Sequence, residues 1–414
     1  MRILVITDLY PPVGYGGYEL ECAALVRWLR RSHDVLVLTS DRDHDTAVPE
    51  KGVRRELPYV AFRRGDSIRA PAATVRAARI TRLALSELDP HLVYMSNNLA
   101  VPQVGALLAV RAGVPVAYRL SESFYARALH RGDLYMASLD GPARGARRAW
   151  GRMVRMLNHH PALRFDPETP VRAAISWCSE SLRRDVELPS TVEPTLERVI
   201  YPASEHGAAL AQLERRPAEQ TTIAYVGHVR TPKGVEVAYR ALAALRDAHG
   251  IEARLVLAGN CTAAMRSQLD ALAGELGIGE QVKLPGFLPA EQLGALLQSA
   301  HALVVPSLAH EAFPLVCIEG ALARVPIVAA RVGGIPEVVV AGEHALLFEP
   351  GDVAACARAL AETFQDPAAT NKRVGRAFEH AREFSVERYL RASEEFIHDA
   401  AAALPERRAS AASS

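Results

Sequence analysis

Hydrophobic residues along this chain gather in short runs that alternate with longer stretches carrying apolar residues on one face. In the first half, these patterns predict strands at 3–7, 35–39, 92–95, 114–119 and 173–178, and helices at 18–31, 73–88 and 102–111. In the second half, they predict strands at 222–227, 254–259, 281–284, 302–306, 327–330 and 345–348, and helices at 234–249, 263–276, 290–299, 353–364 and 371–384.

Strand and helix alternate in both halves, which is typical of an α/β fold in which helices cover both faces of a parallel sheet. The chain therefore predicts two Rossmann-like, doubly wound parallel-sheet domains. The apolar periodicity is lost between Tyr201 and Thr221, so we place the domain boundary there, with domains at 1–204 and 205–384. A last helix, 385–404, has no strand after it, and we expect the Ala- and Ser-rich tail 405–414 to be disordered.

Composition narrows the class of protein. The 414 residues are 49 % hydrophobic, which suits two cores rather than one. The net charge of +1 argues against a nucleic-acid binder, and the five cysteines show no C-x-x-C spacing that would indicate a metal or redox site. The sequence contains no run of 18 or more apolar residues, so it predicts no membrane-spanning helix. The apolar run at the start is too short for a signal peptide, and we therefore expect a cytoplasmic protein.

Unusual loops follow four of the predicted strands, at 11–17, 228–234, 307–314 and 331–337. Ligands of open parallel sheets bind at the carboxyl ends of the strands, where these loops lie. Glycines let backbone amides approach a phosphate, and Lys233 adds a positive charge suited to a diphosphate. Glycine-rich turns are also needed for close packing, but packing alone hardly explains four such loops at the same edge of two sheets.

Two carboxylates, Glu311 and Glu319, are the sharpest local feature. Glu311 follows a strand, and Glu319 lies about one turn into the next predicted helix. Carboxylates accept paired hydrogen bonds from neighbouring hydroxyls, as ribose and sugar rings offer. Glu319 is surrounded by apolar residues, which predicts a buried carboxylate that needs a partner.

These residues resemble the retaining glycosyltransferases of the GT-B fold, family four of the usual sequence classification. The segment 306–319 reads PSLAHEAFPLVCIE, which matches the family pattern of two glutamates separated by seven residues. The family's P-V-V-A and V-G-G-I-P-E-V-V segments correspond to 326–329 and 332–339. Lys233-Gly234 and Gly16-Gly17 match its Lys-Gly and diglycine loops.

The resemblance implies a GT-B fold of two facing domains and transfer of a sugar, with retention, from a nucleotide-diphosphate sugar to a carbohydrate, lipid or small-molecule acceptor. It implies that Glu311 and Lys233 are catalytic and that the last helix crosses back to the first domain. No metal or other cofactor is expected. It assigns donor binding to Glu319, Gly16, Gly17, Arg230, His228, Phe313, Pro314, Leu315 and Val316, and the acceptor side to Ser121 and Glu122.

The chain departs from the family at several positions. His228 stands where an arginine is usual, Ser121 lies where a histidine is often found, and the junction motif V-x-N-G-V-D is replaced at 200–204. A nucleotide-sugar-binding protein without transferase activity, or a GT-B epimerase or phosphorylase, therefore remains an alternative. A nicotinamide dehydrogenase does not fit, because Glu19 occupies the place of the third glycine of G-x-G-x-x-G.

The segment 142–164 holds six arginines and no acidic residue. As a helix, it would place an apolar stripe containing Trp150 opposite Arg144, Arg148, Arg152 and Arg155. Three interpretations remain open: a helix packed on the first domain, peripheral contact with an anionic membrane at its inner face, or a cradle for an anionic acceptor.

Overall fold

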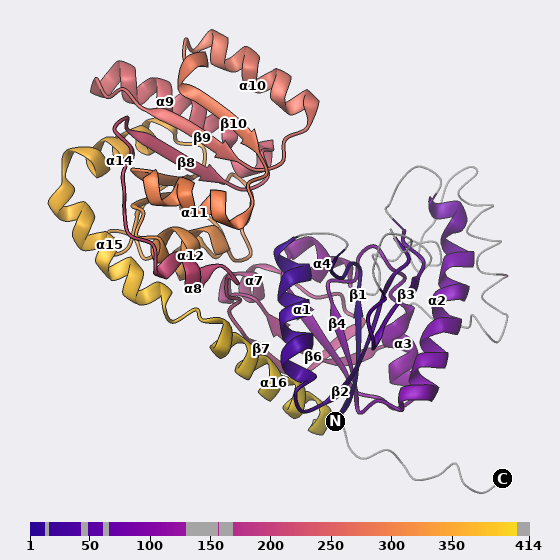
Figure 1. The fold of residues 1–414 in the computed structure, drawn as a ribbon. Coiled ribbons are helices and arrows are strands. Elements are labelled where there is room, and N and C mark those ends of the chain that lie inside the picture. The colour runs from indigo at the N-terminus through magenta and orange to yellow at the C-terminus, as the bar shows by residue number, and fades with distance from the viewer. Residues whose placement is uncertain (13–15, 43–48, 61–65, 130–155, 157–168, 404–414) are drawn as a thin grey trace, which may run out of the picture. The chain divides into compact units, whose positions relative to one another are not determined.

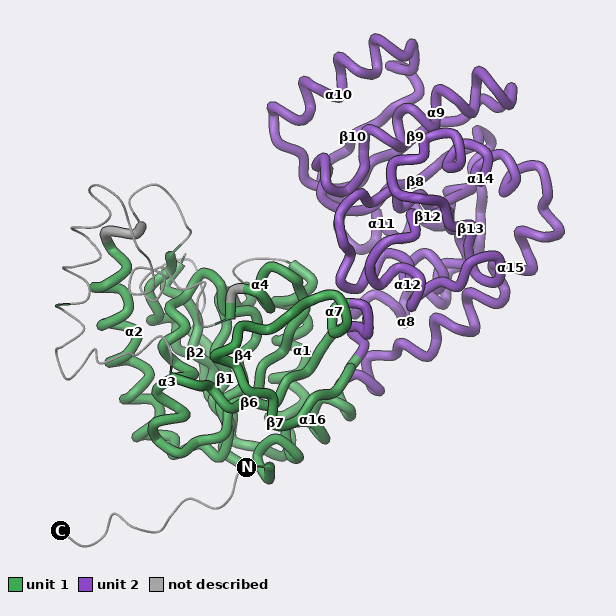
Figure 2. Tube along the Cα trace, turned by 180° about the vertical axis from the view of Figure 1, so that it is seen from behind, with its two compact units in different colours: residues 1–178, 182–200, 390–414 green, residues 179–181, 201–389 purple. Residues whose placement is uncertain are grey.

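A computed structural model describes residues 1–12, 16–42, 49–60, 66–129, 156 and 169–403. Contacts between residues divide the chain into two compact units, coloured separately in Figure 2. The first unit contains residues 1–178 and 182–200 together with the chain from Leu390 onward, and the second contains 179–181 and 201–389.

The first unit is built around a parallel sheet. Its strands are β1 (Arg2–Thr7), β2 (Asp34–Ser40), β3 (Val53–Leu57), β4 (Leu92–Ser96), β5 (Val116–Leu120), β6 (Val171–Trp177) and β7 (Val192–Val199). Their order in the sheet is β3-β2-β1-β4-β5-β6-β7, so the order reverses between β1 and β4 (Figure 1). Residues 3–6 of β1 are almost completely buried at the centre of this sheet.

The helices assigned wholly to the first unit are α1 (Gly17–Leu29), α2 (Asp66–Leu88), α3 (Val104–Arg111) and α4 (Ser123–Ala128). Two helices cross the division of the chain, α7 (Glu180–Asp185) and α16 (Val386–Ala402), and most of α16 belongs to the first unit.

The second unit has its own parallel sheet, with strand order β10-β9-β8-β11-β12-β13. The strands are β8 (Thr222–Val226), β9 (Arg254–Ala258), β10 (Val282–Gly286), β11 (Ala302–Val305), β12 (Ile327–Ala330) and β13 (Leu346–Phe348). Alternate residues of β8 face opposite layers: Ile223 and Tyr225 join one apolar cluster, and Ala224 joins the other. The sheet is therefore buried on both faces, as its continuous apolar strands predict.

Helices form the two outer layers of the second unit. One layer contains α9 (Val235–His249), α10 (Ala263–Glu275) and α14 (Val353–Gln365). The other contains α8 (Gly207–Ala211), α11 (Ala290–Ser299), α12 (Leu315–Leu322), α13 (Ile335–Val338) and α15 (Pro367–Ala381). Two short 3-10 helices, η2 (Thr231–Lys233) and η3 (Gly279–Gln281), lie in the loops.

The α/β class and the repeated parallel sheet predicted from sequence are confirmed. Two strands of the first sheet, β3 and β7, were not predicted. Both lie at an edge of that sheet, where one side is open and polar residues are tolerated, and β3 reads Val-Arg-Arg-Glu-Leu. Their mixed polarity concealed them from a search for apolar runs.

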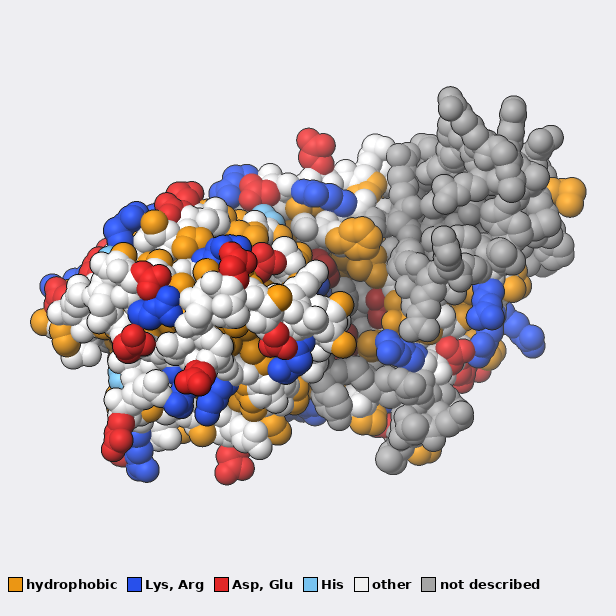
Figure 3. Space-filling view, turned by 90° about the horizontal axis from the view of Figure 1, so that it is seen from above, with side chains coloured by type: hydrophobic (Ala, Val, Ile, Leu, Met, Phe, Trp, Pro, Cys, Tyr) orange, Lys and Arg blue, Asp and Glu red, His pale blue; other side chains and the backbone are white. Residues whose placement is uncertain are grey.

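Acidic and basic side chains are interspersed over the face shown in Figure 3, in keeping with the net charge near zero. None of the helices in the described part of the chain has both the length and the apolar composition needed to cross a membrane. Apart from Met156, the basic segment 142–164 lies outside the described residues, and so does the predicted tail 405–414.

Candidate functional site

Two residues with a strong sequence signal, Lys233 and Glu311, meet beyond the carboxyl ends of the two central strands of the second sheet. Lys233 ends η2, in the loop after β8, and Glu311 lies in the loop after β11. These strands are neighbours, and the strand order reverses between them. The carboxyl end of a sheet at such a reversal is where doubly wound folds bind ligands.

The side chains of Lys233 and Glu311 form a two-pronged ion pair. The ammonium nitrogen of Lys233 donates to both carboxylate oxygens of Glu311, at 2.7 Å and 2.8 Å. The Ser307 hydroxyl donates to Oε1 of the same carboxylate at 2.5 Å. The side chain of Glu311 is only 12 % exposed, and that of Lys233 is 27 % exposed, so the pair is shielded but reachable from solvent. Lys233 has three N–H groups and therefore retains one donor beyond this pair.

Backbone contacts hold the Lys233 and Glu311 loops together. The amides of Leu308 and Ala309 both donate to the carbonyl of Pro232, at 3.0 Å and 3.1 Å. A Cβ on Gly234, whose φ is +69°, would lie 1.7 Å from the carbonyl oxygen of Pro306. Only glycine fits this position. In the Lys-Gly sequence, Lys233 supplies the charge of the ion pair, and Gly234 allows its loop to lie against the loop that carries Glu311.

The loop after β12 supports Glu311 from the other side. The amide of Gly334 donates to the carbonyl of Glu311 at 2.7 Å. A Cβ on Gly333, whose φ is +57°, would lie 2.2 Å from that carbonyl oxygen. The glycine pair predicted as a ligand loop therefore has a clear packing role: it lets one backbone lie directly against the other.

Glu319 lies in α12 and has a partner, as its apolar surroundings predicted. Its Oε1 accepts a hydrogen bond of 2.7 Å from the hydroxyl of Ser204. Burial raises the pKa of the Glu319 carboxyl above its ordinary value, while the Ser204 hydrogen bond and the nearby His206 oppose the shift. The structure does not bring Glu319 and Glu311 into one hydrogen-bonded group among the contacts described, so the two carboxylates have separate surroundings.

Phe313 to Val316 lead into the N-terminus of α12. Pro314 is the N-cap, and the helix begins at Leu315, so the amides of Leu315 and Val316 belong to the first turn. Helix N-termini attract anions because their first amides have no partner within the helix. Phe313 is held by aromatic contacts, stacked on Tyr201 at 5.3 Å and edge-on to Phe384 at 5.6 Å between ring centroids.

His228 and Arg230 are exposed in the loop after β8. The hydroxyl of Tyr225 donates to the carbonyl of His228 at 2.8 Å, which holds the loop to its strand. The pKa of the His228 imidazole is lowered, first by partial desolvation of the ring, although the residue is exposed overall, and then by the positive charges of Arg230 and Lys233. The loop therefore concentrates positive charge even without the usual arginine.

The remaining predicted residues belong to the first unit. Gly16 is the N-cap of α1, and Gly17 begins that helix at the carboxyl end of β1. Ser121 is buried after β5, and the partly buried Glu122 is the N-cap of α4. These four residues follow the carboxyl ends of β1 and β5 in the first sheet, whereas Lys233, Glu311 and Glu319 belong to the second unit.

Sequence reasoning missed Asp8, which directly follows β1 at the carboxyl end of the strands of the first sheet. Its carboxylate accepts hydrogen bonds from the amides of Leu99, Ala100 and Val101, at 2.7 Å, 2.8 Å and 2.9 Å. Burial raises the pKa of Asp8 to about 7, although the three amides favour the charged form. Asp8 thereby fastens the loop after β4 to the end of β1. Its position directly after a predicted strand was the available signal.

Ser204 and Ser307 were also missed as partners of the two glutamates. Ser307 follows its strand directly, within the segment that carries the family resemblance. Ser204 lies in the segment 200–204, where this chain replaces the family's junction motif V-x-N-G-V-D. That departure from the family pattern was the available signal for Ser204.

Comparison with known proteins shows the family of this chain. The model of the family described as glycosyl transferases group 1 matches residues 210–380, which contain Lys233, Glu311 and Glu319. The chain is 34 % identical over 395 residues to the glycogen synthase of Mycobacterium tuberculosis, covering 90 % of this chain and 88 % of that enzyme.

Two further comparisons bear on the relatives and on the fold. The chain is 34 % identical over 203 residues to the D-inositol 3-phosphate glycosyltransferase of Corynebacterium efficiens, where the match spans about half of each chain, at 47 %. The solved structure of Anabaena Alr3699/HepE in complex with UDP-glucose has a TM-score of 0.66 at 19 % identity, covering 96 % of this chain and 99 % of that one, which shows a shared fold. From the glycogen synthase match along almost its whole length, the chain belongs to the group 1 glycosyltransferases of the GT-B fold.

Proposed function

We propose that this protein transfers a hexose from a nucleotide-diphosphate sugar to a hydroxyl group of an acceptor. The observation that carries the proposal is the Lys233–Glu311 ion pair, set at the strand-order reversal of the second sheet with Ser307 on the same carboxylate. The Lys233 ammonium suits the diphosphate half of such a donor. The Glu311 carboxylate can accept hydrogen bonds from the hydroxyls of its sugar half.

In the proposed reaction, Lys233 and the first amides of α12 bind the diphosphate. The bond between the sugar's anomeric carbon and the phosphate oxygen breaks, and its electron pair leaves with the nucleoside diphosphate. An acceptor hydroxyl forms the new bond to that carbon, and its proton passes to the leaving phosphate oxygen. Stabilising the departing charge is the main contribution of the protein, as expected where preorganised donors face a developing anion.

The proposed roles of the individual residues follow the resemblance to the family. Glu311 faces the transferred sugar, Glu319 binds the ribose hydroxyls, and His228 and Arg230 lie beside the diphosphate. Transfer proceeds with retention and without a metal ion, because the diphosphate charge is met by Lys233 and backbone amides. UDP-glucose is the first donor to test, since the structurally similar Anabaena protein is described in complex with it.

On the acceptor side, we place Ser121 and Glu122, together with the loop fastened by Asp8. The acceptor is a carbohydrate, a lipid or another small molecule. We place the protein in the cytoplasm, where nucleotide sugars are made; peripheral contact at the inner face of the membrane is one of the three interpretations given above for residues 142–164.

The test is a binding screen of nucleotide sugars, followed by turnover with candidate acceptors. We expect one donor to bind and to release nucleoside diphosphate only when an acceptor is present, with the anomeric configuration of the product retained by NMR. Donor binding without transfer to any acceptor would favour a binding protein. Conversion of the donor to its epimer without an acceptor would favour an epimerase. Failure of all nucleotide sugars to bind would contradict the proposal.

A further inference from the structure

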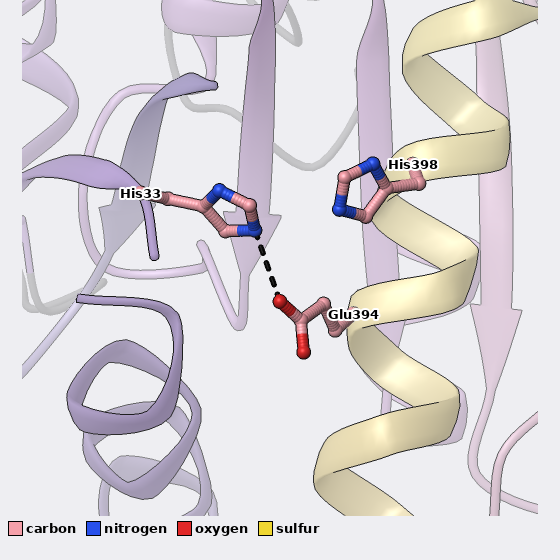
Figure 4. Close-up of side chains that lie close together, drawn as sticks. All are labelled: His33, Glu394 and His398. Atoms are coloured by element: carbon pink, nitrogen blue, oxygen red, sulfur yellow. Dashed lines mark hydrogen bonds and ion pairs between the residues drawn. The ribbon is translucent and has the colours of Figure 1, made fainter. Parts of the chain in front are cut away.

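A second group of polar side chains lies in the first unit, separate from the proposed donor site. It consists of His33, in the turn between α1 and β2, and of Glu394 and His398, on the last helix α16 (Figure 4). Each of the three offers one potential metal-ligand atom, and these atoms all lie within 4.8 Å of one another. Glu394 and His398 are four residues apart in the sequence, so they share one face of the helix.

Contacts orient this group before any ligand binds. Nε2 of His33 lies 3.0 Å from Oε1 of Glu394, and the side chain of His33 is only 7 % exposed. Nε1 of Trp28 donates to the other oxygen, Oε2, at 2.6 Å, and fixes the carboxylate. The rings of His33 and His398 meet edge to face, with centroids 5.2 Å apart.

His398 contacts the group through the edge-to-face packing of its ring on His33 and not through a hydrogen bond. Its ring is exposed, and neither ring nitrogen has a hydrogen-bond partner among the residues that the structure describes. In Figure 4 a ring nitrogen of His398 nevertheless faces His33 and Glu394. The result is two imidazoles and a carboxylate converging on one point from two separate segments of the chain.

We propose that His33, Glu394 and His398 bind a divalent transition-metal ion, with Zn²⁺ as the best match. Two histidines and one glutamate are a ligand set that Zn²⁺ uses, with water completing a tetrahedron. Bonds of about 2.0–2.1 Å require ligand atoms roughly 3.3 Å apart, which rotation of the exposed His398 side chain can provide. Magnesium and calcium, which prefer oxygen ligands, do not suit two imidazoles.

Metal binding selects one tautomer of His33. Nε2 is the ring nitrogen that faces Glu394, so it would bind the ion through its lone pair while the ring hydrogen lies on Nδ1. A metal binds the neutral form of an imidazole, so a hydrogen on Nε2 passes to Nδ1, or to solvent where Nδ1 already carries one.

The ion would fasten α16 to the turn after α1. These segments are 361 residues apart in the sequence, and both belong to the first unit. The metal would therefore stabilise the attachment of the C-terminal helix and take no part in the transfer reaction.

The test uses the full-length protein and Zn²⁺ itself. Zinc binding is measured by competition with a chromophoric chelator, and thermal unfolding is followed with and without zinc. We compare the wild type with His398→Gln and with the matched pair Glu394→Gln and Glu395→Gln, since Glu395 is exposed on the same helix. His398→Gln removes an exposed ring without a hydrogen bond, so the metal-free variant should unfold at the wild-type temperature.

We expect one zinc ion to bind per chain and to raise the unfolding temperature, with no effect of Mg²⁺. His398→Gln and Glu394→Gln should each weaken zinc binding at least about 10-fold, and Glu395→Gln should not. Equal zinc affinity in wild type and His398→Gln would place binding at other residues and overturn the proposal. Failure of zinc to bind or stabilise the wild type would overturn it as well.

Discussion

The ammonium group of Lys233 bonds both oxygens of Glu311, although 78 residues separate them in the chain. Each residue lies in the loop that follows its own strand, Lys233 after β8 and Glu311 after β11, and the two strands are neighbours in the second sheet. The pair joins a cation suited to a diphosphate to a carboxylate suited to a sugar.

Lys233→Ala should weaken donor use by about 10- to 100-fold, the effect of removing a charged hydrogen bond of roughly 1.5–3 kcal/mol. The fold should persist, because Ser307 still donates to Glu311. The measurement is kcat/KM and nucleoside-diphosphate affinity. Lys283→Ala is the control, since Lys283 is an exposed lysine of the same unit. Equal activity in both variants would remove Lys233 from the donor site.

Glu319→Gln should weaken donor binding yet stabilise the protein at neutral and higher pH. Burial raises the pKa of Glu319, so the folded protein favours the neutral acid. The stability that this group contributes is present below its unfolded pKa and is lost as the pH rises through the folded value. A glutamine stays neutral and can still accept from Ser204.

Thermal unfolding between about pH 4.5 and pH 8 checks this prediction. The advantage of Glu319→Gln over the wild type should grow as the pH rises. Glu343→Gln, at an exposed position of the same unit, should show no such trend. A wild type that is more stable than Glu319→Gln at pH 8 would be inconsistent with a penalty for the buried charge.

Gly333→Ala should cost both stability and activity, because its Cβ would meet the Glu311 carbonyl at 2.2 Å. Gly342→Ala is the matched control, with φ of +75° and no atom within 4 Å of its added Cβ. Both variants carry the backbone strain of positive φ, about 1 kcal/mol. Only Gly333→Ala should lose more and shift Glu311. Similar losses of stability and activity in the two variants would show that backbone strain alone matters.

Transfer activity should survive EDTA, because Lys233 and the first amides of α12 are proposed to meet the diphosphate charge. Initial rates are compared before and after chelation, with Mg²⁺ or Mn²⁺ added back. Activity that disappears with EDTA and returns with either ion would require a metal at the donor site. The same chelation should lower the unfolding temperature of zinc-loaded wild type but not of His398→Gln, which separates the two sites.

The sequence predicted most strands of both sheets because buried parallel strands are continuous apolar runs. The edge strands β3 and β7 escaped, since an edge tolerates charged residues such as Arg54 and Glu197. Glu319 was correctly expected to have a hydrogen-bond partner, because the apolar residues around it remove part of its access to water; the residue itself is partly buried. Its partner Ser204 could not be named, since it lies 115 residues away in a junction that departs from the family pattern.

The sequence by itself determined the fold class, the repeat of two parallel sheets, and the identity of Lys233, Glu311 and Glu319 as candidates. Those properties depend on local periodicity and on motifs of contiguous residues. Only the tertiary structure decided which side chains meet: Lys233 with Glu311, Ser204 with Glu319, and His33 with Glu394 and His398. Each of these contacts joins segments far apart in the chain, and strand order and helix packing set such distances, which no spacing along the sequence encodes.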